Sequence, residues 1–480
     1  MARLSEKIGY GLGDMSSSMF WKVFSYYLPF FYTNIFGLTL VDAGTLVLVT
    51  RIWDAVSDPM MGIAADRTHT RWGKYRPYLL FVAPLFSIAG ILLFVTPQGW
   101  SYEAKHLYAY ITYILMMTIY TAINVPYGAM LGVMTDTPHE KTTFSSFRMF
   151  FAYAGSFLVL ASWEPLVNLF RSPTFNLTTP LAWQHTITVV AAICLVLFIL
   201  TFILTRERLQ THSTVSIGHD LQSLLTNRPW WLLIAAALCF NLFSTVRGAT
   251  VAYYFADIVG FNQTLHLTAF GTHYTILFYA GLFLSIGEVA NMLGVACTSP
   301  LARILGKKSL FITTNATLAL LSTLFFFVPA TPSGFWLMLA LQVLISILTG
   351  IMSPLVWSMY ADVSDYAEWR HHTSSTALIF SSSSMAQKFG GALGGAAVLW
   401  LLSASGYEAR TDDQMSAALI IQQPQSALLC LRCLMSLIPA AVALIAAIIC
   451  HHYPLTTHRV EEINTQLHRR RTAQGTTTPS

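Results

Sequence analysis

Three charged side chains interrupt an apolar stretch in the segment TRIWDAVSDPMMG, residues 50–62. Arg51, Asp54 and Asp58 are spaced i, i+3 and i+7, which places them on one face of a helix. A charge at the centre of a bilayer costs about 2.5–3.5 kcal/mol on insertion scales. These side chains must therefore face the interior of the protein or a water-filled cavity.

Two carboxylates one helical turn apart suit the binding of a cation. Asp54 and Asp58 repel each other, so each raises the affinity of the other for a proton or for a hard cation such as Na⁺. The structural alternative is an Arg51–Asp54 salt bridge that only holds helices together, but this leaves Asp58 unexplained. The spacing therefore favours a cation site.

Five further charged residues lie within apolar segments: Lys22, Arg148, Arg247, Glu288 and Lys388. Lys388 occupies the middle of SSSSMAQKFGGALGG, whose glycines permit close helix approach or bending, and we interpret it as functional. For Arg247 and Glu288, an ion pair or a snorkelling side chain that only joins helices explains the sequence at least as well.

The composition is that of a membrane protein. Of 480 residues, 55% are hydrophobic and only 10% are charged, whereas a soluble domain has about 25% charged residues. The net charge of +5 does not indicate nucleic-acid binding, because the basic residues lie in short loops between apolar runs. Neither a Walker A motif nor a nucleophile–base pair is found, so we expect no ATP-driven pump, no enzyme and no cofactor.

Apolar runs of about 20 residues predict twelve membrane-spanning helices. They lie near residues 9–36, 40–64, 77–97, 106–134, 146–169, 182–205, 230–257, 268–298, 309–329, 333–361, 375–404 and 427–451. Most basic loop residues follow the even-numbered spans, which places both termini in the cytoplasm by the positive-inside rule. The polar segment after His451 ends in three arginines, and we expect it to be a mostly disordered tail.

The chain shows weak internal symmetry. GIAADRTHTRWGKYRPYLL after the second span and SPLARILGKKSLFI after the eighth both place a basic Gly-Lys turn before a new helix. Two halves with a binding site between them are the plan of many secondary transporters. We therefore predict an all-α membrane protein with two pseudo-symmetric six-helix bundles. The expected parts are an N-terminal bundle (1–205), a cytoplasmic middle loop (206–229), a C-terminal bundle (230–452) and a cytoplasmic tail (453–480).

Four motifs carry a resemblance to a known family: KIGYGLGD, RIWDAVSDPMMGIAADRTHTRWGKYRPY, NVPYGAM and YADVSDYAEW. From about Lys7 to the end of the twelfth span, the chain resembles the glycoside–pentoside–hexuronide:cation symporters. These form the melibiose-carrier-like branch of the major facilitator superfamily. The resemblance implies the major facilitator fold and alternating access coupled to a cation.

The resemblance also implies a cation site near the second span. Asp54 and Asp58 match the two cation-binding aspartates of the family, and they would hold Na⁺ in a sodium-coupled carrier. Thr121 matches a threonine ligand, whereas Ser57 stands where the melibiose carrier has an asparagine ligand. This exchange weakens the assignment to Na⁺ and leaves H⁺ open as the coupling ion.

Other matches imply a sugar site and a gate. Arg148 and Lys388 match a sugar-site arginine and lysine, and Ser384 lies on the helix face next to Lys388. Asp362 matches an aspartate of the cytoplasmic gate. The loop DRTHTRWGKYRP, with Asp66 and Arg71, is expected to act as a cytoplasmic latch.

Three positions depart from the melibiose carrier. Ser18 and Asn124 replace two sugar-binding aspartates, and Gly128 replaces a nearby tryptophan, so melibiose is not the expected substrate. Lys22, one turn from Ser18, adds a positive charge to the site. One hypothesis is therefore an anionic substrate, such as a hexuronide, aldonate or sulfonated sugar. The alternative is a neutral pentoside or glycoside, with Lys22 salt-bridged elsewhere.

The expected function is cation-coupled symport of a sugar or sugar derivative, with Na⁺ or H⁺ as the coupling ion. An uncoupled facilitator or exporter is an alternative, but the retained aspartate pair argues against it. A non-transporting membrane sensor is a further alternative, but it would normally need a signalling domain. We expect a monomer embedded in the lipid bilayer of the bacterial inner membrane, with no nucleic-acid partner.

Overall fold

The computed structural model describes residues 3–68, 70–135, 138–208, 227–259, 263–269, 272–278, 280–371, 376–409 and 422–475. The first half contains α1 (Leu4–Tyr26), α2 (Leu28–Asn34), α3 (Leu40–Asp66), α4 (Arg76–Leu93), α5 (Tyr102–Met134), α6 (Pro138–Arg171) and α7 (Thr179–Leu204). The second half contains α9 (Arg228–Tyr254), the π-helix η1 (Phe255–Val259), α10 (Ala280–Leu305), α11 (Lys307–Phe326), α12 (Pro332–His371), α13 (Thr376–Ala404), α15 (Gln425–Met435), α16 (Leu437–His451) and α17 (Thr457–Gly475).

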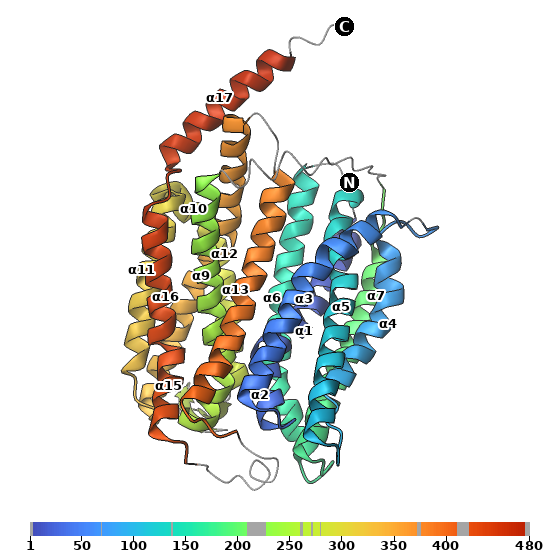
Figure 1. Cartoon of the computed structure of the whole chain (residues 1–480), viewed down its shortest axis with the longest axis vertical. Coiled ribbons are helices and arrows are strands. Elements are labelled where there is room, and N and C mark those ends of the chain that lie inside the picture. Colours follow the sequence, from blue (N-terminus) through green and yellow to red (C-terminus); the bar gives the residue numbers. More distant parts are fainter. Residues whose placement is uncertain are drawn as a thin grey trace.

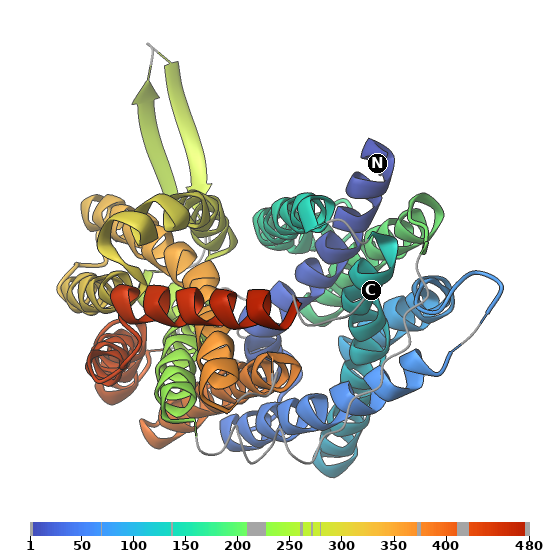
Figure 2. The same ribbon diagram turned by 90° about the horizontal axis from the view of Figure 1, so that it is seen from above.

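The helices form two bundles that stand side by side, with both termini at the same end (Figures 1 and 2). Helices α1 to α7 make the first bundle, and α9 to α16 make the second. The pairs α1–α2, α9–η1 and α15–α16 each build one span, so the described chain crosses the long dimension twelve times. The predicted all-α fold with two six-helix bundles is confirmed.

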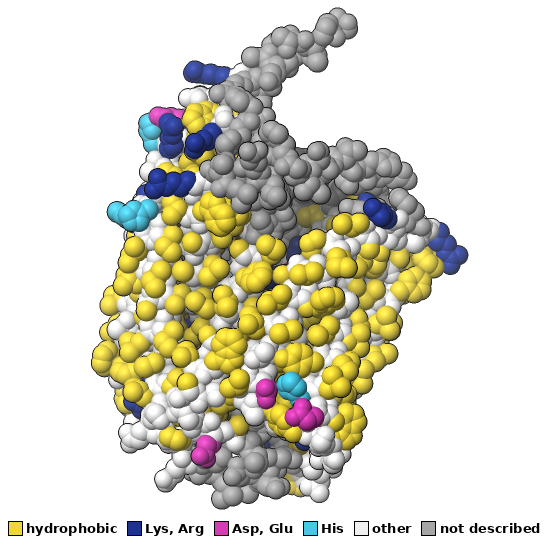
Figure 3. All heavy atoms as spheres, in the orientation of Figure 1, with side chains coloured by type: hydrophobic (Ala, Val, Ile, Leu, Met, Phe, Trp, Pro, Cys, Tyr) yellow, Lys and Arg dark blue, Asp and Glu magenta, His cyan; other side chains and the backbone are white. Residues whose placement is uncertain are grey.

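An apolar surface surrounds the bundles. Among the described residues, nine helices are long and apolar enough to cross a membrane. Figure 3 shows hydrophobic side chains over the face between the two ends, with lysine and arginine gathered near the end that carries the termini. The spans absent from that group are α1–α2, α3 and α13. They are the spans that place Lys22, Asp54, Asp58 and Lys388 inside the protein.

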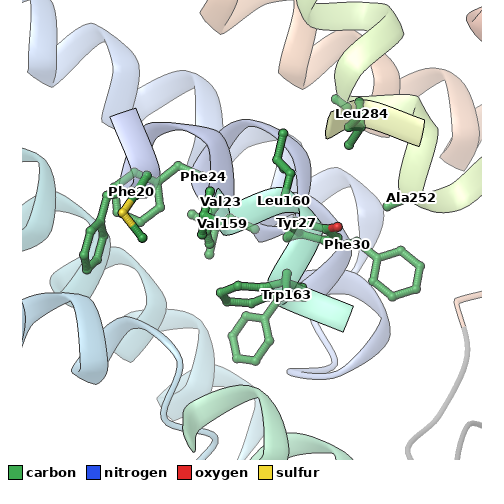
Figure 4. Close-up of a cluster of buried hydrophobic side chains, with 14 of the residues drawn as sticks. Phe20, Val23, Phe24, Tyr27, Phe30, Val159, Leu160, Trp163, Ala252 and Leu284 are labelled. Atoms are coloured by element: carbon green, nitrogen blue, oxygen red, sulfur yellow. The ribbon is translucent and has the colours of Figure 1, made fainter. Parts of the chain in front are cut away.

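The core is aromatic where the bundles meet. Tyr27, between α1 and α2, stacks on Trp163 of α6 with ring centroids 5.3 Å apart, within a cluster that also includes side chains of α9 and α10 (Figure 4). Gly281, in the first turn of α10, packs against this cluster. A larger residue would not fit, because a Cβ atom there would lie 2.1 Å from the carbonyl oxygen of Leu160. Glycine therefore permits the close contact between α6 and α10 at this end.

Two predicted helices are each broken in two, which corrects the expected ranges 9–36 and 427–451. The first breaks at Tyr27, before Pro29, and the second at Ser436, before Pro439. Proline has no N–H group, and its ring clashes with the carbonyl four residues earlier. Pro439 therefore leaves the carbonyl of Met435 free to accept a hydrogen bond from another helix.

The predicted helix 268–298 is wrong at its start. Residues Gln263–Ala269 (β1) and Thr272–Phe278 (β2) form an antiparallel hairpin, with Gln263 opposite Phe278 and Ala269 opposite Thr272. The helix begins only at Ala280. Polar and apolar residues alternate in QTLHLTA, and this period of two is typical of a strand. Figure 2 shows the hairpin extending away from the second bundle.

The prediction of a disordered tail is also wrong, because Thr457–Gly475 forms helix α17. Ile463 and Leu467, four residues apart, are only 2% and 4% exposed. Trp369 of α12 donates a hydrogen bond from Nε1 to Oε1 of Gln466 at 2.6 Å. The tail is therefore an amphipathic helix whose apolar stripe packs on the second bundle, across its end (Figure 2).

The packing of α17 predicts the effect of a charge on its buried stripe. Leu467→Asp should release the helix, because burial of a leucine contributes about 1.5–3 kcal/mol and an unpaired buried carboxylate costs more. Asn464→Asp is the matched control, since Asn464 is exposed on the same helix. Limited trypsin digestion at Arg459 should be faster only in Leu467→Asp. Equal digestion of the two variants would contradict the docked tail.

Candidate functional site

A central cavity of about 500 Å³ lies between the bundles. Side chains from α1, α3, α5, α9 and α13 line it, among them Asp14, Ser18, Trp21, Lys22, Arg51, Asn124, Asn241 and Lys388. The volume falls within the range of about 300–1,000 Å³ that is usual for small-molecule sites. The cavity therefore brings the predicted sugar residues of α1, α5 and α13 around one space.

The two aspartates of α3 meet the hydroxyl group of Thr121 on α5. Thr121 Oγ1 lies 3.0 Å from Oδ1 of Asp54 and 3.1 Å from Oδ1 of Asp58. Ser57 Oγ donates to Thr121 Oγ1 at 3.3 Å and to the carbonyl of Asp54 at 3.1 Å. The four residues predicted to bind the cation therefore lie together.

The ammonium group of Lys388 lies between the two aspartates. Its Nζ is 3.0 Å from Oδ2 of Asp54 and forms a closer ion pair with Oδ2 of Asp58. Asp54 is 1% exposed at its side chain and Asp58 is 30% exposed, so Asp58 is the more accessible of the two. Lys388 thus neutralises part of a carboxylate pair that would otherwise be costly to bury.

Glycines on α13 bring Lys388 to this position. A Cβ atom at Gly395 would lie 3.1 Å from Val47 on α3, and one at Gly390 would lie 3.0 Å from the carbonyl of Leu238 on α9. The motif GGALGG therefore lets α13 pack closely against both neighbours. Lys388, just before the motif, reaches across from the second bundle to the first.

Oxygen atoms dominate the carboxylate site. The carboxylates of Asp54 and Asp58 and the hydroxyl groups of Ser57 and Thr121 suit a proton or a hard cation such as Na⁺. Among the described residues, no group of three or more His, Cys, Asp or Glu side chains suits a metal ion. The donor set therefore suits a proton or a hard cation better than a soft transition metal.

Arg51 does not form the alternative salt bridge with Asp54. Its guanidinium group instead lies 4.1 Å from the ring centroid of Trp21 on α1. Arg51 is 8% exposed, and its buried Nη1 has no hydrogen-bond partner among the described residues. It is therefore a donor at the cavity wall with unused hydrogen-bonding capacity.

Lys22 forms an ion pair with Glu288 of α10. The distance from Nζ to Oε1 is 2.5 Å, and Glu288 is 3% exposed. This is the arrangement that the neutral-substrate alternative required. Like the pair of Lys388 with Asp58, this pair joins the two bundles. Here the lysine belongs to the first bundle and the carboxylate to the second.

Arg148 of α6 pairs with Asp14 of α1 at 3.0 Å and lies over the ring of Tyr127. Sequence reasoning missed Asp14, although a carboxylate within the predicted span 9–36 was a sufficient signal. Ser18 lines the cavity, and Asn124 Oδ1 is buried without a partner among the described residues. The side chain of Ser384 lies outside the described residues.

The predicted gate residues lie apart from one another. Asp362 pairs with Lys307 at 2.7 Å within the second bundle. Arg71 is exposed and stacks on Trp72 with 4.1 Å to the ring centroid. The side chain of Asp66 lies outside the described residues. Arg71 and Asp362 therefore have separate partners in this structure.

Glu207 organises the latch loop, and sequence reasoning missed it. Its carboxylate accepts hydrogen bonds from the backbone N–H groups of Lys74, Tyr75 and Arg76 at 2.7–2.8 Å. These groups begin α4, where a carboxylate satisfies free N–H donors and the helix dipole. The loop is thus tied to the end of α7 within the first bundle.

Contacts between the bundles lie at the end opposite the termini. Thr33 and Tyr253 share a hydrogen bond of 2.8 Å, and Gly281 N donates to Glu164 Oε1 at 3.1 Å. Between described residues, no hydrogen bond or ion pair joins the bundles nearer the termini than that of Lys388 with Asp58. Among the described residues, the contacts between the bundles therefore lie at the end away from the termini and at the cavity.

A family model described as MFS/sugar transport protein matches residues 9–457. The chain is 35% identical to the inner membrane symporter YicJ of Escherichia coli, over 97% of this chain and 95% of that protein. It is 32% identical to the isoprimeverose transporter of Lactiplantibacillus pentosus, over 85% and 82%. It is 30% identical to the glucuronide carrier protein homolog of E. coli, over 97% and 96%.

Solved structures share the fold. A D-xylose–proton symporter superposes with a TM-score of 0.63 over 94% of this chain and 98% of that chain, at 15% identity. At this identity the likeness concerns the architecture alone. It agrees with the two-bundle arrangement described above.

The position of Thr121 predicts a specific loss in ion binding. Thr121→Val keeps the shape but removes the hydroxyl group between Asp54 and Asp58, and hydrogen bonds to charged groups contribute about 1.5–3 kcal/mol. The cation concentration for half-maximal uptake should rise by about tenfold or more, because 1.4 kcal/mol is a factor of ten. Thr121→Ser, which keeps the hydroxyl group, should remain close to wild type. Similar cation dependence in all three proteins would exclude Thr121 as a ligand.

Proposed function

The chain belongs to the MFS/sugar transport protein family and is a multi-pass membrane transporter rather than an enzyme, and we propose that it couples the uptake of a glycoside to a cation. The convergence of Thr121 and Lys388 on Asp54 and Asp58 carries this proposal. It supplies an ion site beside a sugar-sized cavity, and Lys388 belongs to both.

Lys388 links the ion to the sugar. In this structure its ammonium group takes the place of a cation at Asp54 and Asp58. A Na⁺ ion or a proton that binds there competes with Lys388, and the displaced Nζ becomes a free donor in the cavity. A sugar hydroxyl then accepts from Nζ. Cation and sugar must raise each other's affinity by the same factor, because coupling between binding sites is reciprocal.

The sugar binds along the walls of the central cavity in this proposal. The indole ring of Trp21 offers an apolar face to the C–H groups of a sugar ring. Asn124 Oδ1, which has no partner among the described residues, accepts from a sugar hydroxyl. Ser18 provides a further hydroxyl group, and Arg148 is held beside the cavity by Asp14. Ser384 remains a predicted ligand.

The direction of opening follows from the contacts between the bundles. Among the described residues they join the bundles at the end away from the termini, and we propose that the cavity opens toward the end that carries the termini. We assign that end to the cytoplasm of the bacterial inner membrane, which agrees with the gathering of basic residues there (Figure 3). The structure then represents an inward-facing state. Asp66, Arg71 and Asp362 remain predicted gate residues for the opposite state.

The ion pairs favour a neutral substrate. Each of the three basic side chains on which the anionic hypothesis rested has a carboxylate partner: Lys22 with Glu288, Arg148 with Asp14, and Lys388 with Asp58. Until a cation frees Lys388, a negative substrate group would have to displace one of these carboxylates. A neutral pentoside or glycoside needs only hydrogen bonds.

A second candidate is an anionic sugar held by Arg51. Arg51 has no carboxylate partner among the described residues, and its buried Nη1 is unpaired at the cavity. The glucuronide carrier homolog among the relatives shows that this family includes a protein named for an acidic sugar. An arginine is well suited to a carboxylate because its N–H groups bind in pairs.

Replacement of Asp58 tests the coupling. Asp58→Asn in proteoliposomes should abolish accumulation driven by an imposed cation gradient, while sugar exchange across the membrane continues. The reason is that the amide cannot hold the cation that displaces Lys388. Asp42→Asn is the control, since Asp42 begins the same helix and hydrogen-bonds to Tyr102 far from the cavity. Accumulation that survives in Asp58→Asn would refute the assigned ion site.

A panel of labelled sugars tests the charge of the substrate. Proteoliposomes with an imposed Na⁺ gradient, and then with an imposed pH gradient, should accumulate a neutral glycoside and not a glucuronide. The gradient that works identifies the ion. Accumulation of the glucuronide, with an affinity about tenfold lower in Arg51→Gln and unchanged in Lys22→Gln, would establish the second candidate instead. Loss of glucuronide affinity in Lys22→Gln alone would restore the Lys22 hypothesis.

A further inference from the structure

A second pocket of about 220 Å³ adjoins the central cavity on the side of the second bundle. Lys22, Tyr26 and Ser244 line both spaces, so the two are neighbours with a shared wall. The volume lies below the range of about 300–1,000 Å³ for a complete ligand site. The second space, which we name the side pocket, therefore suits an extension of the ligand in the central cavity.

Hydrogen-bonding groups line one wall of the side pocket. Gln342, Ser346 and Thr349 are spaced i, i+4 and i+7 along α12, so they share one face of that helix. Asn291 of α10 faces them and accepts a hydrogen bond of 2.8 Å from Thr349. Tyr26 and Tyr153 add aromatic surface from the first bundle. Amides, hydroxyl groups and aromatic rings together are suited to the hydroxyl and C–H faces of a sugar ring.

Arg247 positions this wall and does not itself serve as an anion site. Its Nη1 donates at 2.8 Å to the carbonyl of Met435, which Pro439 leaves free. Its Nη2 donates at 2.8 Å to Oε1 of Gln342, which fixes the amide. Arg247 is 5% exposed and lies against the ring of Phe325. Its two Nη groups are thus committed to the protein.

Glu288 has an unsatisfied hydrogen-bond acceptor that a ligand could pair with. One carboxylate oxygen pairs with Lys22, and the other, Oε2, is buried without a hydrogen-bond partner among the described residues. An unpaired carboxylate oxygen is costly, and a hydroxyl group is a donor that would satisfy it. The terminal torsion of glutamate is soft, so the carboxylate can turn this oxygen toward the pocket that it lines. Because Lys22 already balances the charge, the ligand part must be neutral.

We propose that the side pocket is a second sugar subsite, and that the substrate is a neutral glycoside of two rings. One ring lies in the central cavity near Trp21 and Asn124. The second ring enters the side pocket, where a hydroxyl group donates to Glu288 and others meet Asn291 and Ser346. This inference rests on the proposed transport of a glycoside. It assigns the second ring to the second bundle, so a two-ring substrate contacts both halves of the carrier.

Binding of one-ring and two-ring sugars to purified protein tests the subsite. Isothermal titration calorimetry should compare methyl glycosides with disaccharides built from the same units, with the coupling ion in excess. For wild type we expect a preferred disaccharide to bind roughly tenfold more tightly than either methyl glycoside, or about 1.4 kcal/mol. Ser346→Leu and, separately, Asn291→Leu fill the side pocket and should remove this preference. Leu344→Ala is the control and should keep this preference, because Leu344 is exposed on the same helix and does not line the side pocket.

Binding of the methyl glycoside shows whether each filled variant is folded, because the central cavity is untouched. Equal binding of one-ring and two-ring sugars by wild type overturns the proposal, as does an undiminished preference in both filled variants. If one filled variant binds no sugar at all, the disaccharide preference of the other filled variant tests the subsite. If wild type binds and accumulates no glycoside under either gradient, the proposed function itself has failed. A carrier that accumulates methyl glycosides as well as disaccharides keeps the function and loses the subsite.

Discussion

The structure depends on the neutralisation of buried charge at the interface between its two bundles. Asp54 is completely buried, and Asp58, one turn away, is only partly exposed. Two ionised carboxylates in such a place are unstable unless a positive charge lies beside them. Lys388 supplies that charge from the other bundle. The same requirement makes the site selective for cations, because any ion that replaces Lys388 must also be positive.

Helix-breaking and helix-packing residues supply the geometry that this balance needs. The glycines after Lys388 let α13 pack closely against the side chain of Val47 on α3 and the backbone of α9. Gly281 does the same for α10 and α6 at the closed end. Pro439 frees a carbonyl that then holds Arg247. The apolar spans provide the volume of the fold, and these few residues set the distances within it.

The fold was predictable from the sequence because the apolar runs are long and their number is clear. The carboxylate site was predictable because a charged side chain in a membrane span costs free energy and because Asp54 and Asp58 lie one helical turn apart on the same face. The partners of the other charges were not predictable, since Lys22 and Glu288 are 266 residues apart in sequence. Only the tertiary fold, in which α6 packs against both α1 and α10, brings them together. The hairpin at 263–278 was missed because the apolar content of this segment also fits a membrane span. The alternation of polar and apolar residues, which indicates a strand, is short. The docked tail was missed because its net polarity hid the stripe of Ile463 and Leu467.

The two lysines at the interface give a physical reason for obligatory coupling. Lys388 reaches from the second bundle to Asp58 of the first, and Lys22 reaches from the first bundle to Glu288 of the second. Any rocking of one bundle on the other strains both pairs. An empty carrier keeps both pairs, so each lysine retains a carboxylate partner. A carrier with the ion alone has displaced Lys388 and holds an ammonium group with no partner in an emptied cavity, which disfavours movement. Only a sugar that accepts from this group and fills the cavity restores the balance, so the empty and the fully loaded forms are the ones able to change face.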